Sequence, residues 1–357
     1  MHADLPIADP LPSFDVDLSQ CSVSGLSSGA FMSVQLHLAH SSMFAGAGIV
    51  AGGPWCCAGS YPGAAPLAGD ARVQNALFVC MNPLIPGAGP DAAALARQAI
   101  DAASQGLIDP VEHLSQDRLY IFTGLADSVV ASSTVRATRD FYRALGVPQG
   151  NLCFVDHVDA GHALLTTNLE DNPLDANQPP YLNRAPGARP QSHDILEHIH
   201  GPLKPAVDRP AGLLMRFDQR EFFDHETRAS MSAYGYVYVP PGVLKGRPAR
   251  VHVVLHGCKQ GANYVDFVDG RPDRGNNPPY GLRYVTTTGY NEMADANDLI
   301  VLYPQAEGID DGRTQNPEGC WDWWGYSCVD PDRPDFHTRD AIQIRALHGM
   351  LQRLGGH

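Results

Sequence analysis

The amino-acid sequence predicts an α/β protein with a mostly parallel central sheet, on two observations. Short apolar runs rich in β-branched residues alternate with runs of helical periodicity, and Gly (35) and Pro (29) are frequent enough to separate them by turns. The expected strands are residues 21–24, 48–51, 119–123, 152–155, 235–239, 250–255 and 299–303. The expected helices are residues 31–39, 135–145, 194–200 and 338–354. Strands that alternate with helices favour a parallel sheet with both faces covered.

The chain of 357 residues is expected to form a single domain over residues 1–357. Two segments interrupt the alternation of strands and helices. Residues 166–216 are rich in Pro and Asn, and residues 259–284 are rich in Gly, Pro, Asp and Asn. Neither segment has low complexity, so both are interpreted as long surface excursions rather than as linkers between domains.

Charge and hydropathy argue against a nucleic-acid partner and against a membrane span. Asp and Glu (39) outnumber Lys and Arg (25), and no basic run is present that could replace the counterions of a nucleic acid. No stretch approaches the ~20 apolar residues that a membrane-spanning helix needs. The first 20 residues lack a basic segment followed by an apolar one, so the chain either stays in the cell or is a mature form without its leader.

Eight cysteines favour an oxidising compartment, extracellular or periplasmic, although buried free thiols in a cytoplasmic protein also fit. Cys320 and Cys328 enclose the aromatic loop CWDWWGYSC and are expected to form a disulfide. A second disulfide is expected between Cys80 and either Cys56 or Cys57. No C-x-x-C pair is present, so no metal site is expected.

The segment Gly25-Leu26-Ser27-Ser28-Gly29 fits the pattern G-x-S-x-G. A nucleophilic serine between a strand and a helix needs a strained turn, and flanking glycines allow backbones to approach closely there. A plain glycine–serine turn would match the same letters. The apolar strand before the motif and the helical run after it favour Ser27 as a nucleophile.

A nucleophilic serine needs a base, and the base needs an orienting acid. Asp127 follows the expected strand 119–123, and His162 follows the expected strand 152–155. Both are therefore expected at strand C-terminal ends, where open α/β sheets bind their ligands. Asp117 and Asp140 are the rival acids, and His157 is the rival base.

Two backbone N–H groups are candidates for binding the oxyanion. One belongs to Ser28, directly after the nucleophile, and the other to Cys258 in the segment His256-Gly257-Cys258. In α/β-hydrolases the segment that corresponds to His-Gly precedes the nucleophile, whereas here it follows. Moving the strands 235–239, 250–255 and 299–303 to the front restores the usual order. The sequence therefore predicts a circularly permuted α/β-hydrolase fold.

Together these motifs resemble the catalytic domain of poly(3-hydroxybutyrate) depolymerases. The matching pieces lie between residues 23 and 328 and read SGLSSGAFMSVQLH, AGGPWCCAG, FTGLADSVV, DAGHALLT, LHGCKQGA, YPQAEG and CWDWWGYS. The resemblance implies a serine esterase with Ser27 as nucleophile, Asp127 and His162 as its partners, and the Ser28 and Cys258 amides as oxyanion hole. It implies no cofactor. Members of this family often carry a linker and a separate substrate-binding domain, but none is expected here because the last expected helix lies close to His357.

The resemblance implies a polyester chain or oligomer as substrate, hydrolysed to 3-hydroxyacid monomers and short oligomers by a monomeric enzyme. The tryptophans expected to bind it are Trp321, Trp323, Trp324 and Trp55, with Trp323 foremost. A packed structural loop is the alternative for some of them. Two alternative functions stay open: a feruloyl or acetylxylan-type carbohydrate esterase, and a non-catalytic polymer-granule-binding protein. The alternative location is the cytoplasm, in association with granules.

Overall fold

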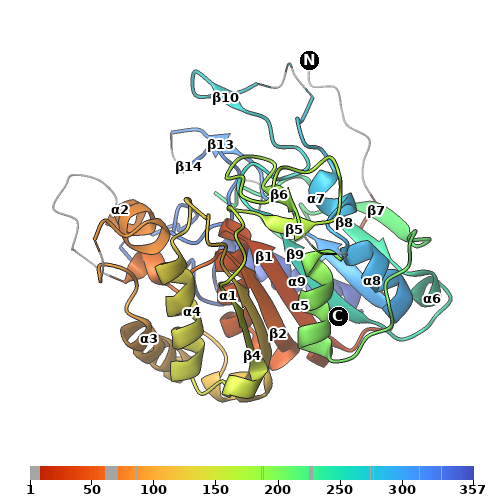
Figure 1. Cartoon of the computed structure of the whole chain (residues 1–357), viewed down its shortest axis with the longest axis horizontal. Helices are drawn as coiled ribbons and strands as arrows, with labels where there is room; N and C mark the ends of the chain where they lie inside the picture. Colours follow the sequence, from red (N-terminus) through yellow and green to blue (C-terminus); the bar gives the residue numbers. More distant parts are fainter. Residues whose placement is uncertain are drawn as a thin grey trace.

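The computed structural model describes residues 9–60, 71–85, 87–185, 187, 189–224, 228–273, 275, 277–312, 314–330 and 332–357. An eight-stranded sheet lies at its centre, in the order β4-β3-β2-β1-β9-β12-β8-β7 (Figure 1). The strands from β4 to β12 run parallel, and β8 and β7 add an antiparallel edge. The bounds are β1 Cys21–Leu26, β2 Phe44–Val50, β3 Arg118–Phe122, β4 Leu152–Val155, β7 Leu213–Asp218, β8 Tyr234–Val239, β9 Arg250–Leu255 and β12 Leu299–Tyr303.

Helices cover both faces of the sheet. On one face α1 packs against β1 and β2 and also contacts α9; on the other, α5 packs on β2 and β3 beside α8 (Figure 1). Gly48 in β2 lets α5 approach, because a Cβ atom there would lie 2.6 Å from Ile195 Cγ2. The helices are α1 Ser28–Ala39, α2 Ala71–Asn75, α3 Ala92–Ser104, α4 Ser132–Ala144, α5 Gln191–His200, α6 Pro241–Leu244, α7 Arg283–Thr286, α8 Tyr290–Asn297 and α9 Ile342–Leu354.

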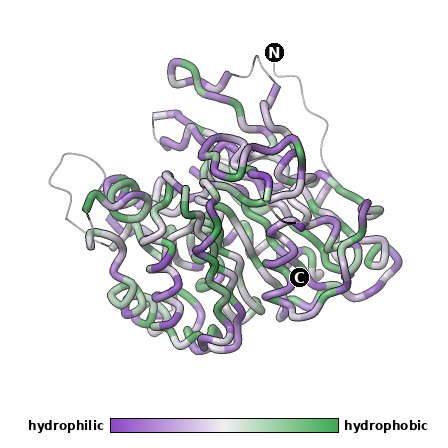
Figure 2. The backbone as a smooth tube through the Cα atoms, viewed as in Figure 1, coloured by the Kyte–Doolittle hydropathy of each residue, from purple (hydrophilic) through white to green (hydrophobic). Residues whose placement is uncertain are grey.

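The central strands are buried because helices exclude water from both of their faces. Every residue of β1, β12 and β9 except Arg250 is buried, and Figure 2 shows hydrophobic residues along the central strands. The expected strands and helices are confirmed, most of them with shifts of a few residues at their ends. The expectation of a mostly parallel sheet is confirmed as well.

The sheet order confirms the circular permutation. β9, which comes late in the chain, lies directly beside β1 and pairs with it from Ser22↔His252 to Gly25↔Leu255. The two ends of the domain lie together, as a permutation requires: the Phe14 N–H donates to the Leu354 carbonyl near the end of α9 at 2.8 Å.

The two segments expected as surface excursions differ from each other. Residues 166–216 supply α5, whose Ile195 and Leu196 are fully buried, and most of β7, so this segment contributes to the main fold. Residues 259–284 carry the short pair β10 Phe267–Val268 and β11 Arg271–Pro272. Two further pairs are β5 Leu164–Thr166 with β6 Leu182–Arg184, and β13 Ile309–Asp310 with β14 Gln315–Asn316. In Figure 1 these pairs lie above the sheet with α2 and α7.

Across the described parts of the chain, no helix combines the length and the apolarity needed to cross a membrane.

Candidate active site

Ser27 occupies the turn between β1 and α1, with φ 56° and ψ −122°. Residues other than Gly rarely adopt this backbone conformation, and holding a residue in it costs roughly 1–3 kcal/mol. The turn is fixed by hydrogen bonds from the Ser27 N–H to the Val50 carbonyl at 3.0 Å and to the Ser27 carbonyl from Ala30 and Phe31. Among residues 21–39 Ser27 alone is not buried. The fold therefore strains the backbone to present this one hydroxyl group.

The glycines of the motif bring three segments together. A Cβ atom on Gly25 would lie 2.3 Å from the Gly29 carbonyl, and one on Gly29 would lie 2.2 Å from the Leu255 carbonyl oxygen. A Cβ atom on Gly257 would lie 3.4 Å from Ser27 Cβ. These approaches place the turn after β9 against the serine, as the permuted sheet order predicts.

Asp127 and His162 form a buried pair. His162 Nδ1 lies 2.9 Å from Asp127 Oδ2, and their side chains are 2% and 0% exposed. The other carboxylate oxygen accepts the N–H groups of Val129 and Val130, each at 2.9 Å. Because a carboxylate only accepts, Nδ1 carries a proton, and Nε2 of the neutral ring is left with its lone pair. His162 can therefore act as a base through Nε2.

The rival residues lie elsewhere. Asp117, just before β3, is bonded to His37 at 2.9 Å, and Asp140 is bonded to Arg139 on α4. His157 is exposed at the start of its loop. Of the candidate acids and bases, the structure pairs only Asp127 with His162.

The amide groups expected to bind an oxyanion flank Ser27. Ser28 is the first residue of α1, so its N–H has no acceptor within the helix. Among the described residues the Cys258 N–H donates to no backbone carbonyl. The turn before Cys258 is held by His256, whose Nε2 accepts the Ala306 N–H at 3.1 Å, so that Nδ1 donates to the Gly257 carbonyl at 2.7 Å. Burial lowers the pKa of His256 to about 4, which keeps this ring neutral.

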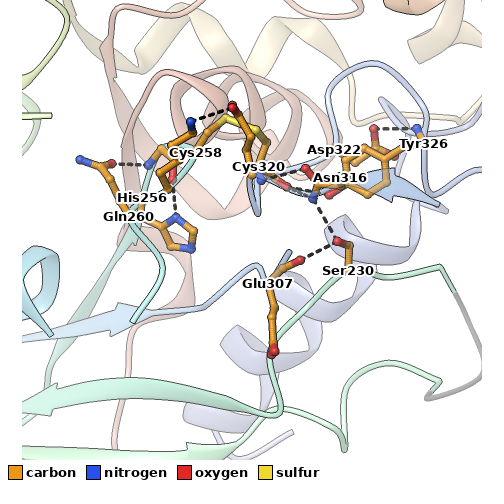
Figure 3. Close-up of a disulfide and its surroundings, with 12 residues drawn as sticks. Ser230, His256, Cys258, Gln260, Glu307, Asn316, Cys320, Asp322 and Tyr326 are labelled. Carbon is orange, nitrogen blue, oxygen red and sulfur yellow. Dashed lines mark hydrogen bonds and ion pairs between the residues drawn. A yellow bond between two sulfur atoms is a disulfide. The ribbon is translucent and has the colours of Figure 1, made fainter. Parts of the chain in front are cut away.

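The expected disulfide between Cys320 and Cys328 is wrong. Cys320 is bonded to Cys258 instead (Figure 3). Cys328 is a buried free thiol. A buried carboxylate holds the aromatic loop: Asp322 accepts the N–H groups of the four residues Trp324, Gly325, Tyr326 and Ser327. The second expected disulfide is confirmed as Cys57–Cys80, and Cys56 is free.

The Cys258–Cys320 disulfide has a consequence for the site. It joins the amide beside Ser27 to the loop that carries the tryptophans, within one residue of Trp321. Cys258, Glu318 and Cys320 form the one cluster of potential metal ligands in the described segments, but the disulfide removes both thiolates. These residues therefore do not fit a metal site.

Ser27 opens into a largely apolar cavity of about 490 Å³. Trp323 stacks on Phe31 of α1 with ring centroids 4.0 Å apart and meets Trp324 edge to face at 5.4 Å. Arg72, Arg228 and Glu318 add charge to the wall. The apolar lining consists mainly of Phe31, Leu77, Met81, Val130, Trp323 and Trp324.

The other two tryptophans do not line this cavity. Trp321 is fully buried beside His256, and Trp55 is 1% exposed and donates its Nε1–H to the His337 carbonyl at 2.8 Å. Both side chains have the packed, structural role that was the alternative at the sequence level. Sequence reasoning missed Phe31, whose helical position carries no sign of an aromatic stack, and Asn177, which contacts the loops of Asp127 and His162.

Two curated proteins are similar to this chain over nearly all of its length, whereas no protein-family model matches it. The poly(3-hydroxybutyrate) depolymerase of Delftia acidovorans is 35% identical over 354 residues, which are 96% of this chain and 61% of that protein. The chain thus spans about three fifths of the length of this relative. The polyhydroxybutyrate depolymerase of Talaromyces funiculosus is 29% identical over 97% of this chain and 93% of its own length.

Solved structures agree with this similarity. The crystal structure of PHB depolymerase from Penicillium funiculosum matches with a TM-score of 0.78 and 27% identity, covering 97% of this chain and 99% of that one. A variant PHB depolymerase complexed with R3HB trimer matches equally well. The resemblance to poly(3-hydroxybutyrate) depolymerases expected from the sequence is confirmed, together with the α/β-hydrolase fold.

Proposed function

We propose that this chain is a serine esterase that hydrolyses poly(3-hydroxybutyrate)-type aliphatic polyesters to 3-hydroxyacid monomers and short oligomers. One observation carries the proposal above all: a buried Asp127–His162 pair in the same fold as a strained Ser27 that opens into an apolar cavity. The names of the relatives support a polyester as the substrate.

The reaction begins with transfer of the Ser27 hydroxyl proton to His162 Nε2 while Oγ attacks the ester carbonyl carbon. Asp127 keeps the ring in the required tautomer and stabilises the imidazolium that forms. His162 then gives the proton to the departing alkoxide, which leaves as the alcohol end of the cleaved chain. Water attacks the acyl-enzyme by the same route, and the carboxylic acid is released.

The carbonyl oxygen gains negative charge in each tetrahedral intermediate. The N–H groups of Ser28 and Cys258 are assigned to stabilise it, since both belong to turns that the fold holds rigidly before substrate arrives. Donors that are already oriented cost no reorganisation during the reaction, and the loss of one such donor typically slows turnover by about 10²- to 10³-fold.

Trp323 and Trp324 are assigned to bind the polyester backbone. Their rings give a broad apolar contact at low entropic cost, and Phe31 holds Trp323 in place. A monomeric state is proposed as well. A location outside the cell or in the periplasm is supported by two disulfides, which persist in oxidising compartments.

The test compares the wild type with Ser27→Ala on p-nitrophenyl butyrate and on a poly(3-hydroxybutyrate) film. We expect the wild type to hydrolyse both and Ser27→Ala to hydrolyse neither, with the variant unfolding at an unchanged temperature. Activity retained by Ser27→Ala would refute the assigned nucleophile. Release of ferulate or acetate from plant polysaccharide, with no attack on the film, would instead identify a carbohydrate esterase; film binding without hydrolysis would identify a polymer-binding protein.

A further inference from the structure

Residues 171–184 lie in the Pro- and Asn-rich segment for which the sequence predicts no periodic structure. In the fold this stretch wraps the loop that carries His162. The Gly161 N–H donates to the Leu174 carbonyl at 2.9 Å, and the Leu164 N–H donates to the Tyr181 carbonyl at 3.0 Å. A Cβ atom on Gly161 would lie 2.1 Å from the Ala176 carbonyl oxygen. The histidine loop and this stretch are therefore packed backbone against backbone.

Asn177 connects the stretch to both members of the Asp127–His162 pair. Its Oδ1 accepts the His162 N–H at 2.9 Å and the Ser128 N–H at 3.0 Å. Its Nδ2 donates to the Ala126 carbonyl at 2.9 Å. The side chain thus bonds the backbone on either side of Asp127 and the backbone of His162 itself.

The Asn177 side chain has no unused hydrogen-bonding group. Its second Nδ2 hydrogen goes to the Asp175 carbonyl at 3.1 Å, so two donors and two acceptor sites are all engaged. Among side chains of this size, only an amide offers two donor hydrogens together with two acceptor lone pairs. Aspartate would keep the acceptors and lose the donors, and alanine would lose both.

Gln260 bonds the other end of the same stretch. It is 2% exposed, and its Nε2 donates to the Pro180 carbonyl at 2.5 Å. Its Oε1 accepts the Gly257 N–H at 2.5 Å, a bond visible in Figure 3. Gly257 precedes Cys258, whose amide is assigned to the oxyanion. Gln260 therefore connects residues 171–184, through its hydrogen bonds, to the turn that carries the amide assigned to the oxyanion.

We infer that residues 177–181 form a bracket that sets the distance between the acid–base pair and the oxyanion turn, with Asn177 and Gln260 as its anchors. The inference rests on the proposed esterase function. Asn177 and Gln260 are positioning residues: neither belongs to the cavity wall that Ser27 opens into, and each acts through the backbone of a residue assigned to the chemistry. Reacting groups displaced by about 1 Å can lose about 10²-fold in rate, so both anchors should govern kcat.

The first experiment measures kcat and KM on p-nitrophenyl butyrate for Asn177→Ala and Gln260→Met. We expect kcat to fall about 10- to 100-fold with KM nearly unchanged, because no contact with substrate is removed. Asn168→Ala is the matched control for Asn177. It replaces a half-buried asparagine of the same segment whose Oδ1 accepts only the local Glu170 N–H at 3.1 Å. We expect the control to keep wild-type kcat.

The second experiment repeats both variants in the background Asp127→Asn. Asn177 acts through the acid–base pair, so once the carboxylate is gone its loss should change kcat by no more than about 2-fold. Gln260 acts through the oxyanion turn and should keep its full effect in that background. A purely structural role of Asn177 would instead give the same factor in both backgrounds. Should Asn177→Ala fail to fold, Asn177→Asp retains both acceptors and should show a smaller loss of kcat in the same cycle.

Two results would overturn the bracket: wild-type kcat in Asn177→Ala and Gln260→Met, or an Asn177→Ala effect on kcat that is as large in the Asp127→Asn background as in the wild type. A different set of results would show that the proposed esterase function itself is wrong. In that case the wild type is inactive on esters, or Ser27→Ala retains activity, whatever the anchors do.

Discussion

A single carboxylate sets the protonation of the site. One carboxylate oxygen of Asp127 accepts two N–H groups of its own loop, and the other accepts the hydrogen bond from His162 Nδ1. The two hydrogen bonds from backbone N–H groups fix the direction of the carboxylate independently of the histidine. Local backbone geometry therefore decides which ring nitrogen of His162 carries the proton, and with it which one is left as the base.

Asp127→Asn should test this directly. The Asn oxygen can still accept the two backbone N–H groups, so its NH₂ group is turned toward His162 Nδ1. Nδ1 must then accept, which moves the ring proton to Nε2 and removes the base. We expect kcat for a soluble ester to fall about 10³- to 10⁴-fold while the fold is retained. Asp159→Asn, exposed on the same loop as His162, is the control and should be near wild type; equal losses in both variants would contradict the assignment.

At the scale of elements, the sequence was most informative where periodicity and burial coincide. β9 and β12 were predicted with their observed ends because their short apolar runs are buried on both faces, and the partly buried edge strand β4 was predicted with its observed ends as well. α3 was missed because alanines dominate its buried face, and β7 because it is a largely unburied edge strand. In the site, motif and chain order predicted Ser27, Asp127 and His162, and the structure pairs the last two.

Contacts made by chain topology were not predictable in this way. Cys258 and Cys320 are 62 residues apart, and only the loop geometry beyond β9 brings them together. Asn177 carries no signal either, because its role comes from backbone groups of two other loops. Long-range pairing of this kind needs coordinates, whereas a strand that feeds a nucleophile turn can be recognised locally.

In Gly29→Ala two effects on the free energy of unfolding oppose each other: alanine has the higher helix propensity, but its side chain would clash with closely packed backbone. Alanine is favoured over glycine by about 1 kcal/mol inside a helix. Here its Cβ would lie 2.2 Å from the Leu255 carbonyl oxygen and 2.5 Å from that of His256, both rigid backbone atoms of β9 and its turn. We expect the clash to prevail, with a loss of about 1–3 kcal/mol in the free energy of unfolding and a lower kcat, because α1 carries the Ser28 amide.

Gly150→Ala is the matched control, since nothing lies within 4 Å of a Cβ atom there. Chemical denaturation should give it wild-type stability. A stable, fully active Gly29→Ala would show that α1 and β9 can separate without harm to the site.

For the whole molecule, buried neutral histidines dominate the response to acid. Burial is the foremost cause of a lowered pKa in seven of them: His40, His193, His200, His252, His256, His337 and His348. The pKa is about 4 for His40, His256 and His337 and about 3 for His200. His252 lies in the sheet between the Ser22 and Ser24 hydroxyl groups and stacks on Tyr290, with no carboxylate in this network. The folded core therefore resists protonation.

The sign of the pH effect follows from these pKa values. The unfolded chain binds protons to its histidines near pH 6.5, whereas the folded chain does so only near pH 4 or below for the most buried ones. Their contribution to stability is complete above pH 6.5 and is lost as the pH falls toward 4, by about 1 kcal/mol per pH unit for each such histidine. Urea denaturation from pH 8 to 4.5 should show this decline, and His252→Gln, which keeps a donor and an acceptor, should flatten it. A free energy of unfolding that stays level to pH 4.5 would mean that these rings are protonated in the folded protein.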